Sequence, residues 1–152
     1  MKTLQTGEKL YEALKILVEL TKFAQNNFPN QTYLSSKQWA KEFCTINLRV
    51  PRRSGHDYCI AQFLKDNPDL CPVIFAPVRS IEEILKQELK EHKVNNTLYS
   101  GSNINALRGI KNINCAICTC ASMMSKTKIE KIYDLSLVYI PVNPNFLFLM
   151  IG

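Results

Sequence analysis

Apolar residues recur at helical spacing in two long segments of the chain, residues 8–26 and 81–93. In both segments they return every three or four positions while charged residues fill the other faces, which predicts amphipathic helices. Ser80 and Glu83 match a capping box at the start of the second segment. Asn95 and Asn96 follow its end and predict a turn there.

Shorter segments follow the same period and are also predicted to be helical: 36–44, 55–65, 103–108 and 126–133. Ser35 and Gln38 form a capping box at the start of the first. Ser54 is the candidate cap of the segment that begins at residue 55.

Continuous apolar runs predict the strands. Prolines bound the run Cys71–Val78, which favours an edge strand or an extended segment, and residues 113–120 have the pattern of a buried strand. Residues 135–152 carry no charge, a length that approaches a membrane span. The PVNPN sequence in their middle favours a turn, so residues 135–140 and 146–151 are predicted to pair as a β-hairpin, with no membrane segment.

The order of these elements predicts the fold class. Helices come first and mixed helices and strands follow, which is typical of an α+β fold. A chain of 152 residues with 46% hydrophobic and 21% charged residues suits one globular domain. We therefore expect a single domain over 1–152, with a three-helix subregion at 1–68 and a mixed α/β subregion at 69–152 that ends in the hairpin.

Positive charge gathers in two segments of this basic chain, which has a net charge of +6. Residues 37–65 hold six basic residues and two acids, and residues 103–131 hold five basic residues and one acid. A cationic loop between helices is a common way to present charge to a phosphate backbone. The predicted nucleic-acid site comprises Lys37, Lys41, Arg49, Arg52, Arg53, His56, Arg108 and Lys111.

Residues 8–65, three helices before a short strand, resemble the start of a helix-turn-helix or winged-helix DNA-binding domain. The resemblance implies that Arg52, Arg53 and His56 lie at the start of a recognition helix. It also implies that Lys37 contacts a phosphate from the preceding helix, as does the neighbouring Lys41, and that DNA is a better ligand than RNA.

The connection between the second and third helices departs from that family. The family's turn has three to four residues, whereas the gap from Cys44 to Gly55 is about ten. If the third helix does not enter a DNA groove, the loop 45–54 is a basic finger that could bind RNA or an acidic protein.

The six cysteines do not suggest a disulfide framework, because no apolar signal-peptide core precedes the first acids. We expect a cytoplasmic or nuclear protein that is not secreted. Cys115 and Cys118 have a spacing that zinc can use, and His56 and Cys59 are weak candidates for further ligands. Strand alternation favours a core role instead, since it sends Cys115 to one face and Cys118 to the other, so no cofactor is expected.

The candidate functions follow from these observations. We expect a non-enzymatic binding domain for nucleic acid. The alternative is a protein-interaction module, an adaptor or inhibitor, that uses the basic surface and the apolar C-terminal hairpin, alone or as a homodimer. Enzyme activity is a lesser alternative, because no common catalytic fingerprint is present. An enzyme would pair His56, as the base, with Cys59, Cys115 or Cys118 as the nucleophile.

Overall fold

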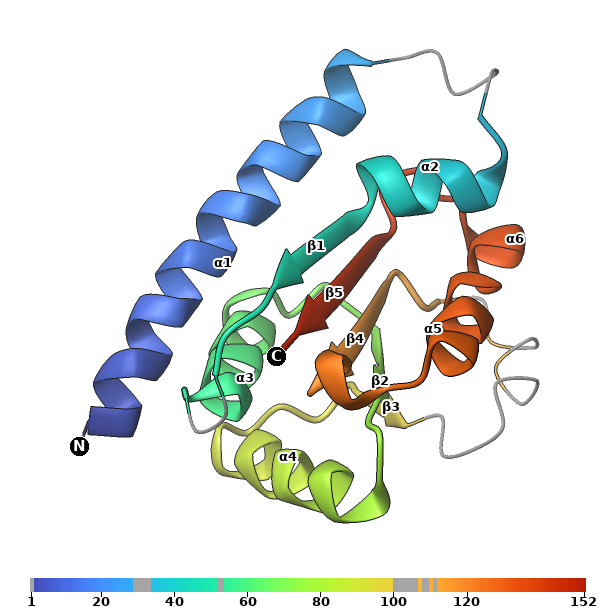
Figure 1. Cartoon of the computed structure of the whole chain (residues 1–152). Coiled ribbons are helices and arrows are strands. Elements are labelled where there is room, and N and C mark those ends of the chain that lie inside the picture. Colours follow the sequence, from blue (N-terminus) through green and yellow to red (C-terminus); the bar gives the residue numbers. More distant parts are fainter. Residues whose placement is uncertain (1, 29–33, 52–53, 100–106, 108–109, 111) are drawn as a thin grey trace.

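The computed structural model of the protein describes residues 2–28, 34–51, 54–99, 107, 110 and 112–152 (Figure 1). Helices and strands alternate along this part of the chain, which confirms the expected mixture of α and β structure. The elements are α1 (Lys2–Asn27), α2 (Ser36–Phe43), β1 (Thr45–Leu48), α3 (His56–Asp66), β2 (Pro72–Phe75), α4 (Arg79–Glu91), β3 (Leu98–Tyr99), β4 (Cys115–Thr119), the 3₁₀ turn η3 (Ala121–Met123), α5 (Lys126–Tyr133), α6 (Ser136–Tyr139) and β5 (Leu147–Ile151).

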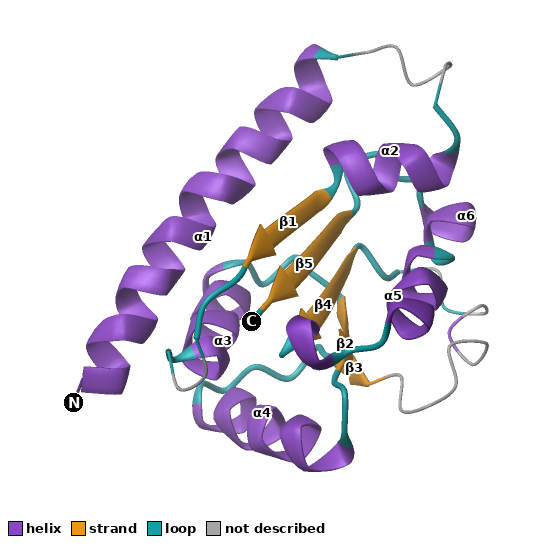
Figure 2. Cartoon of the chain, viewed as in Figure 1, coloured by secondary structure: helices purple, strands orange, loops and turns teal. Residues whose placement is uncertain are grey.

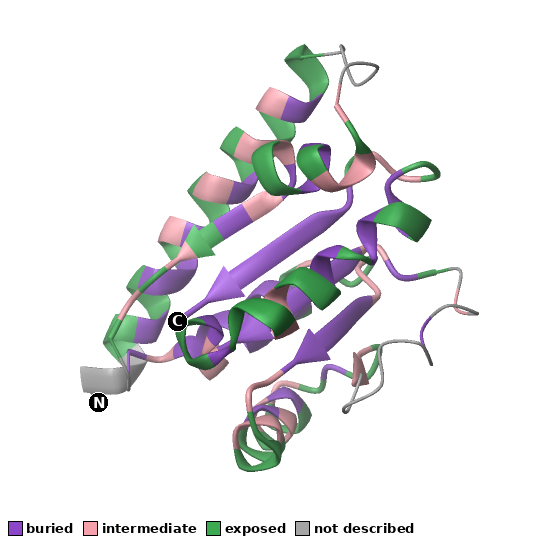
Figure 3. Ribbon diagram, turned by 45° about the vertical axis from the view of Figure 1, so that its right-hand side comes forward, coloured by how far each residue is buried: buried purple, intermediate pink, exposed green. Residues whose placement is uncertain are grey.

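The strands form one five-stranded sheet in the order β1-β5-β4-β2-β3. Every pair in it is parallel. β5 lies between β1 and β4 and is wholly buried (Figures 1 and 3). The predicted C-terminal hairpin is therefore wrong. Residues 136–139 are helical, and the last apolar run pairs with β1 and β4. A strand that is apolar on both faces suits a sheet that helices cover on both sides.

Two other strand predictions needed the tertiary structure. β2 pairs with β4 on one side and β3 on the other, so the predicted edge strand is interior. Its proline, Pro72, is the first residue of the strand, where a missing N–H is tolerated. β1 was not predicted at all, because its four residues lie inside the segment assigned to the basic loop.

The helix ends agree with the sequence at some caps and differ at others. The capping box of Ser35 and Gln38 is confirmed. Ser54 does not cap α3: its hydroxyl donates to the Pro51 carbonyl, and the cap residue is Gly55 in a left-handed conformation with φ 83°. α4 begins at Arg79, so the capping box predicted at its second residue is wrong.

Helices cover both faces of the sheet, each over its own apolar cluster (Figure 2). α1, α3 and α4 pack on one face, where Leu14, Ile60 and Leu85 meet Leu149 of β5. α2, α5 and α6 lie with the other cluster, which contains Trp39, Ile132 and Phe148. β1 comes from the N-terminal subregion and β5 from the C-terminal end, so both subregions share one sheet.

The long helix α1 lies along α3 and the outer side of β1 (Figure 1). Gly7 allows a close approach there, since a Cβ at this position would lie 2.9 Å from Tyr58 Cδ1. In the part of the chain that the structure describes, no helix combines the length and the apolar character needed to cross a membrane.

Candidate nucleic-acid interface

The carboxyl ends of all the parallel strands lie at one edge of the sheet, which we call the carboxyl edge. Open parallel sheets bind ligands at this edge because the loops that follow the strands converge there. The connecting segments after β1, β2 and β4 are residues 49–55, 76–78 and 120–125, and they contain no Asp or Glu. Arg49 is the described basic residue in these segments, and Arg79 and Lys126 are the first residues of the helices that follow the second and third of them.

The opposite edge is close to neutral. In the described parts of the segments that precede β2, β3, β4 and β5, the charged residues are one acid, Asp69, and one lysine, Lys93. The nearest acids to the carboxyl edge lie in the first turns of helices, where Asp57 is half-buried and Glu82 is paired with Lys86 at 3.2 Å. Among the described residues, the positive excess therefore lies at the carboxyl edge, where Arg49, Arg79 and Lys126 stand.

Arg49 is one of the described residues through which this edge presents free positive charge. It follows the last residue of β1, is exposed, and forms no ion pair with any other described residue. Arg79 is 91% exposed at its side chain and approaches Glu83 only at 3.9 Å. A guanidinium that stays in water and unpaired retains its full charge for an anionic ligand.

A groove of about 470 Å³ opens beside Arg49. It lies between the ends of β1 and β5 on one side and η3 and α5 on the other. Its buried lining residues, which form its floor, are mainly apolar, and its exposed lining residues, which form its rim, are the polar or charged Asn47, Arg49 and Ser122. The lining residues are Asn47, Leu48, Arg49, Ala121, Ser122, Met124, Ile129, Tyr133, Met150 and Gly152.

Gly152 joins the groups around the groove. Its N–H donates to the Leu48 carbonyl at 2.9 Å, and its carbonyl accepts from the Ser122 N–H at 2.8 Å. Its φ is +94°, and a Cβ here would lie 2.8 Å from His56 Cε1 and 3.2 Å from Cys120 Cα. Only glycine fits this position, where the start of α3 meets the ends of β1 and β4.

His56 is buried at that meeting point and not on an exposed recognition helix. It is 9% exposed, and burial lowers the pKa of its imidazole, although hydrogen bonds to the backbone of Val50 and Pro51 act in the opposite direction. His56 Nε2 has no hydrogen-bond partner among the described residues. A neutral imidazole in this place contributes little positive charge to phosphate binding.

Thr119 is a second buried polar residue at the carboxyl edge. It is the last residue of β4 and is 0% exposed, and its Oγ1 has no partner among the described residues. Nearby, the Lys128 ammonium donates to the Ala76 carbonyl at the end of β2. Lys128 therefore lies over the point where the connections from β2 and β4 diverge toward opposite faces, which is the usual ligand position in such sheets.

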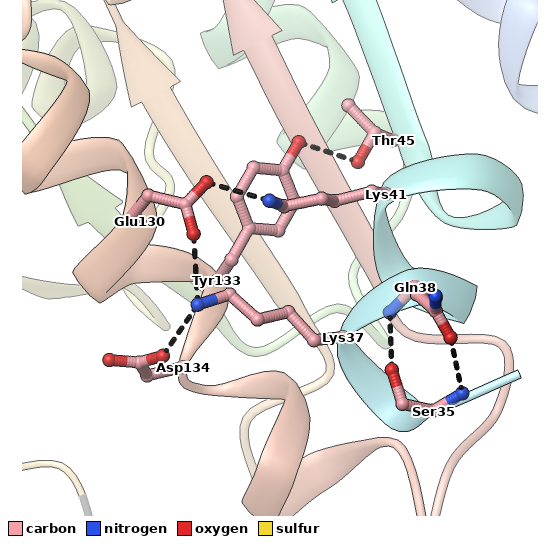
Figure 4. A network of polar contacts seen from close by, with 8 residues as sticks. All are labelled: Ser35, Lys37, Gln38, Lys41, Thr45, Glu130, Tyr133 and Asp134. Atoms are coloured by element: carbon pink, nitrogen blue, oxygen red, sulfur yellow. Dashed lines mark hydrogen bonds and ion pairs between the residues drawn. The ribbon is translucent and has the colours of Figure 1, made fainter.

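Glu130 of α5 holds both Lys37 and Lys41, and Asp134, which caps the end of α5, also holds Lys37 (Figure 4). Lys37 Nζ lies 2.9 Å from Glu130 and 3.0 Å from Asp134, and Lys41 Nζ lies 2.6 Å from Glu130. These contacts raise the pKa of Lys37 and lower that of Glu130, with the side-chain hydrogen bonds as the main cause. The helix surface offered by α2 is thus compensated in charge.

The same network borders the groove. The Tyr133 hydroxyl and the Thr45 hydroxyl share a hydrogen bond of 2.8 Å (Figure 4). Lys41 Nζ lies 5.4 Å from the centre of the Tyr133 ring, and the Phe148 ring packs 5.1 Å away. Tyr133 is therefore a fixed wall of the groove.

The cysteine arrangement does not build a metal site among the described residues, where no group of three or more potential ligands is found. Cys115 belongs to one core cluster and Cys118 to the other, so the two thiols face opposite sides of the sheet. Burial raises the pKa of Cys59 and of Cys118 to about 12, and it raises that of Cys115 as well. These thiols are core groups and not activated nucleophiles.

The remaining predicted site residues, Arg52, Arg53, Arg108 and Lys111, lie outside the described residues. The sequence had not suggested Asn47, Ser122 or Lys128. Asn47 lies near the end of β1, Ser122 in η3 and Lys128 in α5, and their place beside the carboxyl edge becomes readable only once the strand directions are known.

Comparisons with models of protein families, with curated proteins and with solved structures found no match to this chain.

Proposed function

We propose that the protein binds nucleic acid at the carboxyl edge of its sheet. The observation that carries this proposal is the charge of the connecting segments there, which contain basic residues and no acids. Phosphate binding depends on such unpaired cations, and the net charge of +6 adds long-range attraction to a polyanion. Arg49 is the residue that we expect to contribute most among those described.

The proposal shifts the expected contacts away from α2. Lys37 and Lys41 are already paired with carboxylates, and a phosphate would have to compete with Glu130 for them. Arg49 and Arg79 have no such strong competitor. The charge of the carboxyl edge favours DNA only as it favours any polyanion, because phosphate contacts carry no sequence information.

The first test is fluorescence anisotropy with labelled DNA and RNA over a salt series, using the native chain, Arg49→Ala and Lys90→Ala. Lys90 is an exposed cation at the far end of α4, so Lys90→Ala removes the same charge from the opposite edge. We expect Arg49→Ala to weaken binding and to reduce the slope of log K against log salt by about one, as for the loss of one phosphate contact. We expect Lys90→Ala to leave the slope unchanged.

Two results would contradict the proposal. Absence of binding at low salt, where electrostatic attraction is least screened, would remove nucleic acid as a ligand. Equal effects of Arg49→Ala and Lys90→Ala on binding would mean that net charge alone causes the attraction. The carboxyl edge would then have no special role.

A protein-interaction function has a different supporting observation. Its expected surface, the C-terminal apolar run, is buried in β5. The exposed apolar residues of α1, Ile16, Leu20 and Phe23, instead follow the three-and-four spacing of a helix-packing seam. A second copy of α1 is the partner that presents the same seam, so light scattering should find a dimer that Leu20→Glu dissociates. A monomer at high concentration would exclude it.

A further inference from the structure

We infer that the groove beside Arg49 receives an unpaired nucleobase, so that the ligand is single-stranded nucleic acid. This inference rests on the proposed function and names the part of the nucleic acid that enters the site. Three properties of the groove carry it: its size, the chemistry of its floor and the chemistry of its rim.

The size of the groove suits one nucleotide. Its 470 Å³ lies within the range of about 300–1,000 Å³ that is usual for small-ligand sites. A duplex presents its bases stacked and covered, and its convex backbone cannot enter a cavity of this size. A base that leaves the stack can enter, while the adjoining phosphates stay outside in contact with the basic edge.

The floor of the groove suits the face of an aromatic ring. Met124, Ile129 and Met150 line it from the cluster that contains Phe148, and both methionines are less than 10% exposed and therefore held in place by the core. Thioether groups make favourable contacts with aromatic rings and adapt to rings of different outline. A free phosphate would leave this apolar surface in water and gain nothing from it.

The rim of the groove suits the edge of a base and its phosphate. Asn47 and Ser122 are exposed there and carry an amide and a hydroxyl. An amide can pair with the donor and acceptor groups on a base edge. The Arg49 guanidinium can stack on a base or hold the adjoining phosphate through two parallel hydrogen bonds. The apolar floor, the polar rim and the Arg49 cation together match a whole nucleotide better than they match a base or a phosphate alone.

The wall of the groove is already formed. Tyr133 is fixed by its hydrogen bond to Thr45 and by its contact with Phe148, and Gly152 is fixed by hydrogen bonds to β1 and η3. Preformed walls lower the ordering cost of binding. A ligand group of the right shape can therefore bind without a rearrangement of the fold.

The test compares three labelled ligands of equal length by fluorescence anisotropy: a single-stranded oligonucleotide, an oligomer of abasic sites and a duplex. The abasic oligomer keeps the phosphates and removes the bases. We expect the single strand to bind about tenfold more tightly than the abasic oligomer, which is typical of a single base contact. We expect Ser122→Trp, which fills the groove, to reduce the affinity for the single strand to that for the abasic oligomer.

Thr127→Trp is the matched control, because Thr127 is exposed at the start of α5 and does not line the groove. It should leave all three affinities unchanged. If Ser122→Trp fails to fold, Asn47→Ala replaces it, since an exposed residue on an edge strand tolerates truncation. Asn47→Ala should reduce the preference for the single strand over the abasic oligomer severalfold.

The outcomes separate this inference from the proposed function. Equal binding of the single strand and the abasic oligomer would overturn the base site and leave phosphate binding at the carboxyl edge intact. A preference for bases that survives Ser122→Trp, or Asn47→Ala in its place, would overturn the groove as its location. No binding of any ligand would overturn the proposed function itself.

Discussion

At the residue scale, the carboxyl edge contains polar atoms that the core does not satisfy. Thr119 is 0% exposed, and its Oγ1 has no described partner, whereas the hydroxyl of Thr45 bonds to the Ala40 carbonyl and to Tyr133, each at 2.8 Å. A buried hydroxyl without a partner loses its hydration and gains nothing in return. Such atoms lower the stability of the fold where they stand.

The two threonines form a matched pair for measurement. Thr119→Val removes the unpaired hydroxyl with almost no change of volume, and we expect it to raise the free energy of unfolding by up to about 1 kcal/mol. Thr45→Val removes a paired hydroxyl and leaves Tyr133 without its partner, so we expect a loss of about 1–2 kcal/mol. Urea unfolding measures both. A destabilised Thr119→Val would mean that the Thr119 hydroxyl is hydrogen-bonded in solution.

Asp57 provides the second residue-level prediction. Burial, and to a lesser extent the charge of Glu88, raise the pKa of this carboxyl to about 6. The folded state therefore holds a proton that the unfolded state releases near its ordinary pKa of about 3.9. Between these two values stability falls as the pH rises, by at most about 3 kcal/mol in total, because the folded protein binds more protons.

Asp57→Asn should remove this pH dependence and raise the free energy of unfolding at neutral pH. Urea unfolding at pH 4, 5, 6 and 7 measures it. Glu88→Gln serves as a partial variant and should weaken the dependence without removing it, because burial is the larger cause. Parallel stability profiles for Asp57→Asn and the native chain would show that the carboxyl titrates normally.

At the element scale, β5 decides the architecture. It hydrogen-bonds to β1 and β4, and all five of its residues are buried. Leu149 and Phe148 point to opposite clusters, so one strand contributes to both cores. The helix α6 and the turn that follows it bring the chain back to the amino end of the sheet, which makes β5 parallel to its neighbours.

Substitutions in that turn and in β5 test how much each contributes to the core. Leu149→Ala should lower the free energy of unfolding by about 2–5 kcal/mol, as expected for a fully buried leucine. Val142 is 80% exposed, and Val142→Ala should change the free energy of unfolding by less than about 0.5 kcal/mol. Chemical denaturation measures both. Equal, small effects would be incompatible with a central β5.

At the scale of the whole molecule, the N-terminal and C-terminal parts share their core. β1 is paired with β5 over four residues, and Trp39 donates its indole N–H to the Pro144 carbonyl at 2.8 Å. Trp39 also lies in the cluster that contains Phe146 and Phe148. Each part contributes a strand or a helical layer that covers the core of the other. We therefore expect the two parts to be stable only together.

This sharing predicts one cooperative unfolding transition. Fluorescence of Trp39, the only tryptophan, reports on the contact between the two parts, and far-ultraviolet circular dichroism reports on the helices of both. The two signals should give the same midpoint and the same denaturant slope. A separate transition for the fluorescence signal would show that residues 1–68 and 69–152 unfold independently.

The sequence by itself determined the positions of most helices, the buried strand that became β4 and the uneven charge of the chain. These are local properties: helical period, caps and apolar runs depend on neighbours within one or two turns. The sequence also favoured a core role for the cysteines, and alternation along β4 does place Cys115 and Cys118 on opposite faces. The capping box at Ser35 belongs to the same class, since both of its partners lie within four residues.

Only the tertiary structure decided the direction of the strands, the place of β1 and β5 in the sheet, and with them the candidate site. Strand direction depends on where the chain returns after a crossover, and parallel pairing joins residues that are more than a hundred positions apart, such as Ile46 and Leu149. Charge compensation is also non-local: Lys37 and Lys41 look free in the sequence until α5 brings Glu130 beside them. The groove beside Arg49 exists because three separate chain segments end at one edge of the sheet, and no local pattern encodes that convergence.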